Sequence, residues 1–245
     1  MTDAQKKEWD AHFGPSNQEF LADFKSGKLS HRDIVKWKYR RYMRNYLSTV
    51  KAVDESVGRM LAYLDENDLA KNTIVIYSSD QGFYLGEHGW YDKRWMFEES
   101  FRMPFVVRWP GVVQPQSKPK GLIQNIDYAP TFLEIAGLDV PSHVQGRSLG
   151  PLLRGQSADW RESLYYAYYE LGEHAVPQHF GVRTQTHKLF YIPQTDEWNL
   201  FDLERDPLEM KSVHADPEYR ETREKLEAEF VRLRRKFDAP DFETK

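Results

Sequence analysis

The stretch Ser78–Trp95, SSDQGFYLGEHGWYDKRW, directly follows the apolar run Thr73–Tyr77, TIVIY. It places a carboxylate, an amide, a histidine and two cations immediately behind that run. The run is rich in β-branched residues and predicts a buried strand over residues 73–79. In open α/β sheets, ligands collect at the carboxyl ends of strands. The polar stretch therefore marks a candidate ligand site.

Asp80 and Gln81 are the first candidates for ligand binding, because they come directly after the predicted strand. Carboxylate and amide oxygens are hard ligands, which suit Ca²⁺ or Mg²⁺ rather than zinc. Lys93 and Arg94 would supply positive charge for an anion. The same residue types also suit a plain turn, in which His88 would only bond a loop carbonyl. Residue types alone leave both interpretations open.

The flanking elements predict a layered α/β arrangement. Apolar residues recur at spacings of three and four from Ser30 to about Glu66, which predicts a long amphipathic helix with Ser30 as its N-cap. Residues 104–109 predict a second buried strand, and residues 127–136 predict a helix capped by Asp127. Both strands are continuous apolar runs, typical of parallel strands buried on two faces. This order suits the end of an α/β sheet.

A different pattern follows the stretch rich in Pro, Gly and Ser over about residues 141–157. Short strands in hairpin succession are predicted over residues 163–170, 179–184, 187–192 and 198–203. A charged amphipathic helix is predicted from Pro217 to about Phe237. We therefore divide the chain into an α/β portion, residues 1–155, and a subdomain of antiparallel strands with one packed helix, residues 156–245.

The composition excludes several classes of protein. The 245 residues include no cysteine, which rules out disulfides, thiolate catalysis and cysteine zinc sites. The net charge is −4 and the cations are scattered, which argues against a nucleic-acid partner. No apolar run approaches the roughly 20 residues that span a bilayer, so no membrane partner is expected. The first residues, MTDAQKKEWDAHFG, lack the apolar core of a signal peptide, and the sequence alone does not give the compartment.

The stretch VIYSSDQGFYLGEHGWYDKRWMFEESFRMPFVVRWPG resembles the second signature of the type I, formylglycine-dependent sulfatases of the alkaline phosphatase superfamily. The likeness continues through QNIDYAPTFLEIAG and QGRSLGPLLRG to LFDLERDPLEM, and YLSTVKAVDESVGRMLAYLDENDL upstream is also similar. The resemblance implies that residues 1–155 are the C-terminal part of an alkaline-phosphatase-like α/β sandwich. Residues 156–245 would then be the C-terminal subdomain of the family.

The resemblance also implies roles for single residues. Asp80 falls at the metal-binding aspartate of the family and Gln81 at its Asn, His or Gln partner, which together imply part of a site for one Ca²⁺. Lys93 falls at the lysine that holds a sulfate oxygen, where a cation would offset charge on the leaving ester oxygen. His88 either contacts the substrate or shapes the loop. His179 is the candidate for sugar binding within the subdomain.

The nucleophile motif of the family has no counterpart in this chain. Family sulfatases use a formylglycine made from Cys or Ser in a Cys/Ser-x-Pro-x-Arg motif, and the nearest segment here, SKPKG at residues 117–121, lacks the arginine. The N-terminal Asp-Asp metal ligands are also missing. The chain thus resembles the C-terminal half of a longer sulfatase and is expected to be inactive alone. The missing N-terminal half, or a second copy of the chain, is the expected protein partner.

The implied activity is that of a sulfuric ester hydrolase. The segments DQGFYLGEHGW and KRWMFEES look most like bacterial carbohydrate sulfatases that act on 6-sulfated N-acetylglucosamine in glycosaminoglycans or mucins. A sulfated carbohydrate is therefore the expected substrate, and a periplasmic or secreted location is expected. Two alternatives stay open: a phosphodiesterase or phosphonate hydrolase of the same superfamily, or a non-catalytic remnant that binds carbohydrate or a partner chain.

Overall fold

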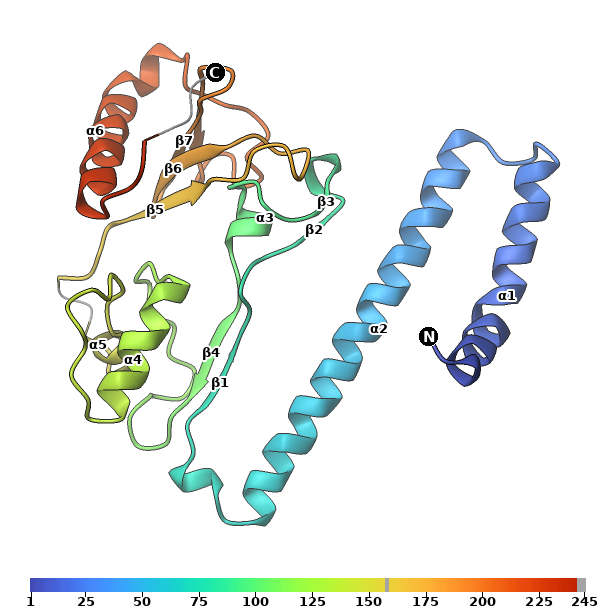
Figure 1. Cartoon of the computed structure of the whole chain (residues 1–245), viewed down its shortest axis with the longest axis horizontal. Helices are drawn as coiled ribbons and strands as arrows, with labels where there is room; N and C mark the ends of the chain where they lie inside the picture. The colour runs from blue at the N-terminus through green and yellow to red at the C-terminus, as the bar shows by residue number, and fades with distance from the viewer. Residues whose placement is uncertain (157–158, 242–245) are drawn as a thin grey trace. The chain divides into compact units, whose positions relative to one another are not determined.

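The computed structural model describes residues 1–156 and 159–241. The chain divides into two compact units, Met1–Ala70 and Lys71–Lys245 (Figure 1). The first unit is helical, and the second contains all the strands of the described residues. The boundary predicted near residue 155 lies inside the second unit, between helix α5 (Gly150–Leu153) and strand β5 (Ser163–Tyr168), and stays a prediction.

The first unit consists of helices α1 (Asp3–Lys25) and α2 (His31–Glu66). Helix α2 begins as predicted, because Ser30 Oγ accepts a hydrogen bond from the Asp33 amide at 3.2 Å and the Asp33 carboxylate accepts one from the Ser30 amide at 3.2 Å. Phe20 of α1 stacks on Trp37 of α2 with ring centroids 4.0 Å apart. Within the described residues, no helix is long and apolar enough to cross a membrane.

The second unit begins with a two-stranded sheet of β1 (Val75–Ser78) and β4 (Phe105–Arg108). Both strands were predicted, but the expectation that they are parallel and buried is wrong. They pair antiparallel, and Tyr77 and Val106 are 44% and 61% exposed. The reason is that Tyr77 and Val106 are paired across the two strands and share one face of the sheet, which the described residues leave largely uncovered.

The polar stretch forms the connection between β1 and β4. It is built from short pieces: β2 (Tyr84–Leu85), the 3-10 turn η2 (Glu87–Gly89), β3 (Tyr91–Asp92) and helix α3 (Glu98–Phe101). Strands β2 and β3 pair antiparallel as a hairpin. The remaining short elements among the described residues before β5 are η1 (Ala70–Asn72), η3 (Asn125–Asp127) and α5.

The helix predicted over residues 127–136 is α4 (Tyr128–Ile135). The sequence had suggested that Asp127 caps this helix. Its side chain, however, makes no capping hydrogen bond. The Asp127 carboxylate is instead fully buried and accepts hydrogen bonds from the Gln124 and Arg147 amides, each at 2.8 Å. It also pairs with the guanidinium of Arg161, which joins the start of α4 to the segment before β5.

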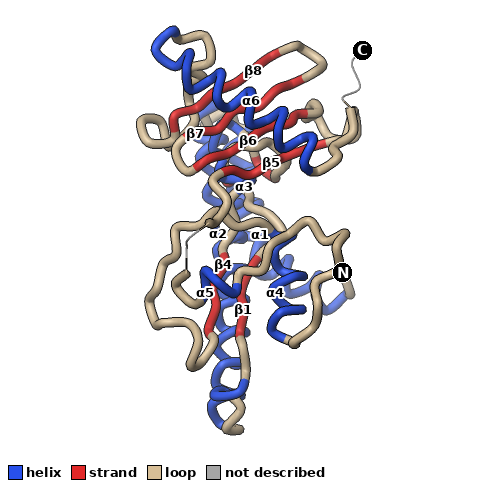
Figure 2. The backbone as a smooth tube through the Cα atoms, turned by 90° about the vertical axis from the view of Figure 1, so that its left-hand side faces the viewer, coloured by secondary structure: helices blue, strands red, loops and turns tan. Residues whose placement is uncertain are grey.

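The C-terminal sheet runs in the order β5-β6-β7-β8, with all neighbours antiparallel. Its further strands are β6 (His179–Thr184), β7 (His187–Ile192) and β8 (Glu197–Asp202), and they are followed by η4 (Pro217–Tyr219) and helix α6 (Arg220–Lys236). Helix α6 lies across all four strands (Figure 2). The predicted strands and the predicted helix are thus confirmed, with ends that shift by a few residues.

The C-terminal sheet buries apolar side chains on both faces. On one face Phe180, Val182, Leu189 and Leu200 pack with Leu226, Phe230 and Leu233 of α6. On the other face Phe190, Ile192 and Phe201 pack against Met96, with Trp95, Phe97 and Phe101 around it. The loop between β3 and β4 therefore belongs to the core of this sheet, and the sheet positions the polar stretch.

Candidate active site

Asp80, Gln81 and Lys93 line one cavity of about 440 Å³. Asp80 and Gln81 come from the end of β1, and Lys93 follows the β2–β3 hairpin. Further lining residues come from β5 and the residue just after it, and from residues 123–126 and 237–240. The structure therefore brings together the predicted metal ligands and the predicted sulfate-binding lysine.

The segment directly after β1 places two residues with oxygen ligands at the cavity. Asp80 is exposed, and Gln81 is held by Ser79, whose hydroxyl donates to the Gln81 carbonyl at 2.8 Å. One carboxylate and one amide oxygen fit a hard cation such as Ca²⁺ or Mg²⁺ in chemistry. Ca²⁺ usually takes about six to eight oxygens, so these two side chains make up only part of such a site.

Lys93 lies between two residues with unusual backbone geometry. Asp92 and Arg94 have φ values of +97° and +101°, in a region that costs side-chain-bearing residues about 1–3 kcal/mol and that the surrounding structure must enforce. Lys93 Nζ is 3.3 Å from Asp92 Oδ1, and the Arg94 guanidinium bonds the other carboxylate oxygen. Burial acts to raise the pKa of Asp92, but the two cations outweigh it and hold that pKa below its ordinary value.

Sequence reasoning did not single out Asp92. The signal that could have identified it is an acid followed directly by two cations, Asp92-Lys93-Arg94, at the end of a hairpin. The carboxylate of Asp92 is the acceptor that restrains both neighbouring cations, so it sets where Lys93 can point. Arg94 was noted as a source of positive charge, and it does line the cavity.

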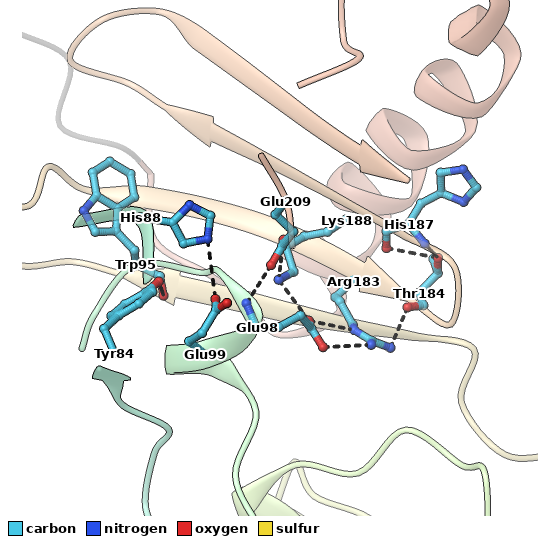
Figure 3. A network of polar contacts seen from close by, with 10 residues as sticks. All are labelled: Tyr84, His88, Trp95, Glu98, Glu99, Arg183, Thr184, His187, Lys188 and Glu209. Carbon is cyan, nitrogen blue, oxygen red and sulfur yellow. Dashed lines mark hydrogen bonds and ion pairs between the residues drawn. The ribbon is translucent and has the colours of Figure 1, made fainter. Parts of the chain in front are cut away.

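His88 lies in η2, between the two strands of the β2–β3 hairpin, and is not among the residues that line the cavity. Its φ is +55°, its ring stacks on Phe97 with centroids 4.3 Å apart, and Nε2 is 3.6 Å from Glu99 Oε2 (Figure 3). Of the two roles that the sequence left open, this arrangement supports shaping of the loop. Contact of His88 with substrate stays a prediction.

His179 is fully buried at the start of β6 and does not line the cavity. Its Nδ1 is 2.9 Å from the Pro177 carbonyl, and its ring stacks on Trp95 with centroids 5.0 Å apart. Burial lowers the pKa of His179 to about 4, although the Pro177 carbonyl acts in the opposite direction. In this arrangement the imidazole packs against Trp95, which directly follows Arg94 in the chain. Sugar binding by His179 stays a prediction.

Strand β5, together with Tyr169 directly after it, supplies the aromatic wall of the cavity. Tyr165, Tyr166 and Tyr169 line it, and the Tyr166 hydroxyl donates to the Arg94 carbonyl at 2.6 Å. Burial raises the pKa of Tyr165 to about 12, so its phenol is neutral at physiological pH. The structure shows a strand whose tyrosines pack in the core and also face the cavity.

Comparison with known proteins identifies the family of this chain. The sulfatase family model matches residues 10–138, and the model described as "N-sulphoglucosamine sulphohydrolase, C-terminal" matches residues 86–236. The chain therefore belongs to the sulfatase family, and the resemblance found in the sequence motifs is confirmed.

Two relatives indicate which kind of sulfatase the chain is similar to. The chain is 43% identical over 231 residues to an N-acetylglucosamine-6-O-sulfatase of Bacteroides thetaiotaomicron, covering 92% of this chain and 41% of that protein. It is 35% identical over 136 residues to the human N-acetylglucosamine-6-sulfatase, covering 54% of this chain and 24% of that protein.

A solved structure of a protein in complex with its substrate, D-glucosamine-2-N,6-O-disulfate, is similar over 98% of this chain and 49% of that one, with a TM-score of 0.91 and 41% identity. The α/β fold class with small antiparallel sheets is thereby confirmed. The chain spans about half the length of these relatives, or less.

Proposed function

We propose that this chain supplies one half of a sulfatase active site, which hydrolyses 6-O-sulfate esters of glucosamine-type sugars. The observation that carries the proposal is the convergence of Asp80, Gln81 and Lys93 on one cavity. The nucleophile and the remaining metal ligands would come from a segment equivalent to the part of the relatives that this chain does not span.

Each residue has a defined task in this proposal. Asp80 and Gln81 would hold a divalent cation, which, when bound, neutralises the sulfate. Lys93 would bind a sulfate oxygen and stabilise the negative charge that develops as the ester bond breaks. Asp92 and Arg94 would keep the ammonium of Lys93 directed at that oxygen, because they restrain the backbone and the charge on either side of it.

The sugar would lie against the aromatic wall. Tyr169 is half exposed, and it lies on the same cavity as Lys93. Aromatic faces offer rigid apolar surface beside a polar group, which suits a sugar ring with its hydroxyls. The substrate class is proposed because the similar Bacteroides thetaiotaomicron protein is an N-acetylglucosamine-6-O-sulfatase and the structural relative binds a 6-O-sulfated glucosamine.

The test mixes the purified chain with the unmatched N-terminal portion of the Bacteroides thetaiotaomicron relative, prepared with its nucleophile in the mature form. Sulfate release from N-acetylglucosamine-6-sulfate is measured by ion chromatography, beside hydrolysis of an aryl phosphodiester. We expect sulfate release by the mixture and by neither part alone. Faster hydrolysis of the phosphodiester, or no sulfate release from a mixture shown to associate, would contradict the proposal.

A further inference from the structure

The two parts of the candidate site are both attached to one residue of helix α3. The Ser100 carbonyl accepts a hydrogen bond from the Gly82 amide at 2.8 Å, and the Ser100 hydroxyl accepts one from the Arg94 amide at 2.8 Å. Gly82 directly follows the predicted metal ligands, and Arg94 directly follows the predicted sulfate-binding lysine. Ser100 is buried, so these bonds are shielded from water. The position of α3 therefore sets the position of both parts.

The contact between α3 and the metal-ligand segment is close. A Cβ on Gly82 would lie 2.0 Å from the Glu99 carbonyl oxygen and 2.5 Å from the Arg102 carbonyl oxygen, which are impossible distances. The backbone after β1 thus passes directly against the backbone of α3. A shift of α3 would move the segment that carries Asp80 and Gln81, because no side chain lies between to absorb the motion.

Helix α3 is itself tied to the C-terminal sheet by buried charges (Figure 3). The Glu98 carboxylate lies 2.9 Å from Lys188 Nζ and 3.1 Å from Arg183 Nη2. The Glu98 amide donates to Glu209 Oε2 at 2.7 Å, and the other oxygen of Glu209 is 2.7 Å from Lys188 Nζ. Lys188, on β7, is fully buried and lies between two carboxylates from distant parts of the chain.

The charges in this network depend on one another. Burial acts to raise the pKa of Glu98, but Lys188 and Arg183 more than offset it, and the pKa lies below its ordinary value. Burial holds the pKa of Glu209 above its ordinary value, although Lys188 lowers it. A buried ion pair often stabilises no more than apolar residues of similar volume would. What the network adds is direction, since the hydrogen bonds of Glu98 with Arg183 and Glu209 fix angles and distances that apolar contacts leave loose.

We propose that Lys188 is a positioning residue for the candidate active site. Through Glu98 it holds α3 on the sheet, and through Ser100 it keeps the metal-ligand segment and the segment of Lys93 in register. The importance of this positioning for catalysis rests on the proposed function. The coupling of Lys188 to the two segments is a property of the chain alone, so it can be observed without substrate.

The test is amide hydrogen exchange of the whole chain, followed by NMR, in Glu98→Ala and Lys188→Met. We expect the amides of Gly82 and Arg94 to exchange about tenfold faster in both variants, relative to the amides of β6 and β7 in the same protein. The amides of the sheet report global stability, so a purely structural loss would move all of them together. Glu98→Ala leaves Lys188 paired with Glu209 and is the variant to rely on if Lys188→Met does not fold.

Arg161→Met is the matched control, because it also breaks an ion pair to a buried carboxylate, that of Asp127, and this pair joins residues outside α3. We expect it to change all amides in proportion. If Gly82 and Arg94 in Glu98→Ala exchange in proportion to the sheet, as in the control, the positioning role is wrong. Failure of the proposed function is distinguishable, since it would abolish sulfate release by the mixed protein and leave these exchange rates unchanged.

Discussion

At the scale of the residue, His179 shows how burial controls charge beside the candidate site. Its pKa is about 4 in the folded chain, because burial disfavours the charged imidazolium, and the ordinary value is 6.5. Between these two pH values the unfolded chain binds a proton that the folded chain does not. The free energy of unfolding therefore falls as the pH decreases through this window, and above pH 6.5 this group adds no pH dependence.

We expect this loss to be about 3 kcal/mol in total, since each pKa unit corresponds to about 1.4 kcal/mol. Urea unfolding of the chain and of His179→Phe, at several pH values from 4 to 7.5, measures it. Phe keeps the ring among Trp95 and the tyrosines of β5 but cannot take a proton. The pH dependence should be shallower in the variant by this amount. Identical pH dependence in the two proteins would mean that His179 is not kept neutral by burial.

The candidate site was predictable from sequence where its residues belong to one local pattern. Asp80, Gln81 and Lys93 lie within one polar stretch behind an apolar strand, and they do meet in one cavity. The burial of His179 was not predictable, because it depends on Trp95, which packs on β6 from a distant part of the chain. The pairing of Lys188 with Glu98 is equally long-range, and no spacing in the sequence signals it.

At the scale of the element, the packing of α6 on the C-terminal sheet carries much of the core of the second unit. Phe230 of α6 is 3% exposed, and its ring lies 5.6 Å from that of Trp198 and 6.0 Å from that of Tyr165. The next residue, Val231, is 45% exposed. Substitutions at these two neighbouring positions of α6 therefore distinguish the effect of lost burial from the effect of changed helix propensity.

We expect Phe230→Ala to lower the free energy of unfolding by about 3–5 kcal/mol, because it removes buried apolar surface and leaves a cavity. Val231→Ala should change it by less than about 0.5 kcal/mol. Urea denaturation followed by circular dichroism measures both. Similar effects of the two substitutions would contradict the placement of α6 on the sheet.

The elements were predicted well where hydrophobic periodicity and turns are local. Strands β6 and β7 have the predicted bounds, and Ser30 caps α2 as expected. The arrangement of β1 and β4 was not predicted, because a short apolar run fits several kinds of strand and does not encode the direction of its neighbour. Helix α1 was not predicted either, because its sequence lacks a strong apolar stripe. Accordingly, no residue of α1 is buried.

At the scale of the whole molecule, the chain exposes apolar side chains on elements of both units. Val106 and Tyr77 on the β1–β4 sheet, and Met60 and Leu47 on α2, are 61%, 44%, 69% and 56% exposed. Exposed apolar surface and open strand edges promote association. The purified chain should therefore form oligomers or bind an apolar dye, as measured by light scattering and dye fluorescence. A stable monomer that binds no dye would contradict this expectation.

In the proposed function, Lys93 acts on sulfate in a site shared with Asp80 and Gln81. The most direct measurement is kcat/KM for sulfate release from N-acetylglucosamine-6-sulfate by the mixed protein, with Lys93→Ala compared with the exposed control Lys118→Ala. We expect Lys93→Ala to lower kcat/KM about 100-fold or more, since a cation that stabilises developing charge is lost. Lys118→Ala should leave it unchanged. Equal rates for Lys93→Ala and the unmodified chain would contradict the account.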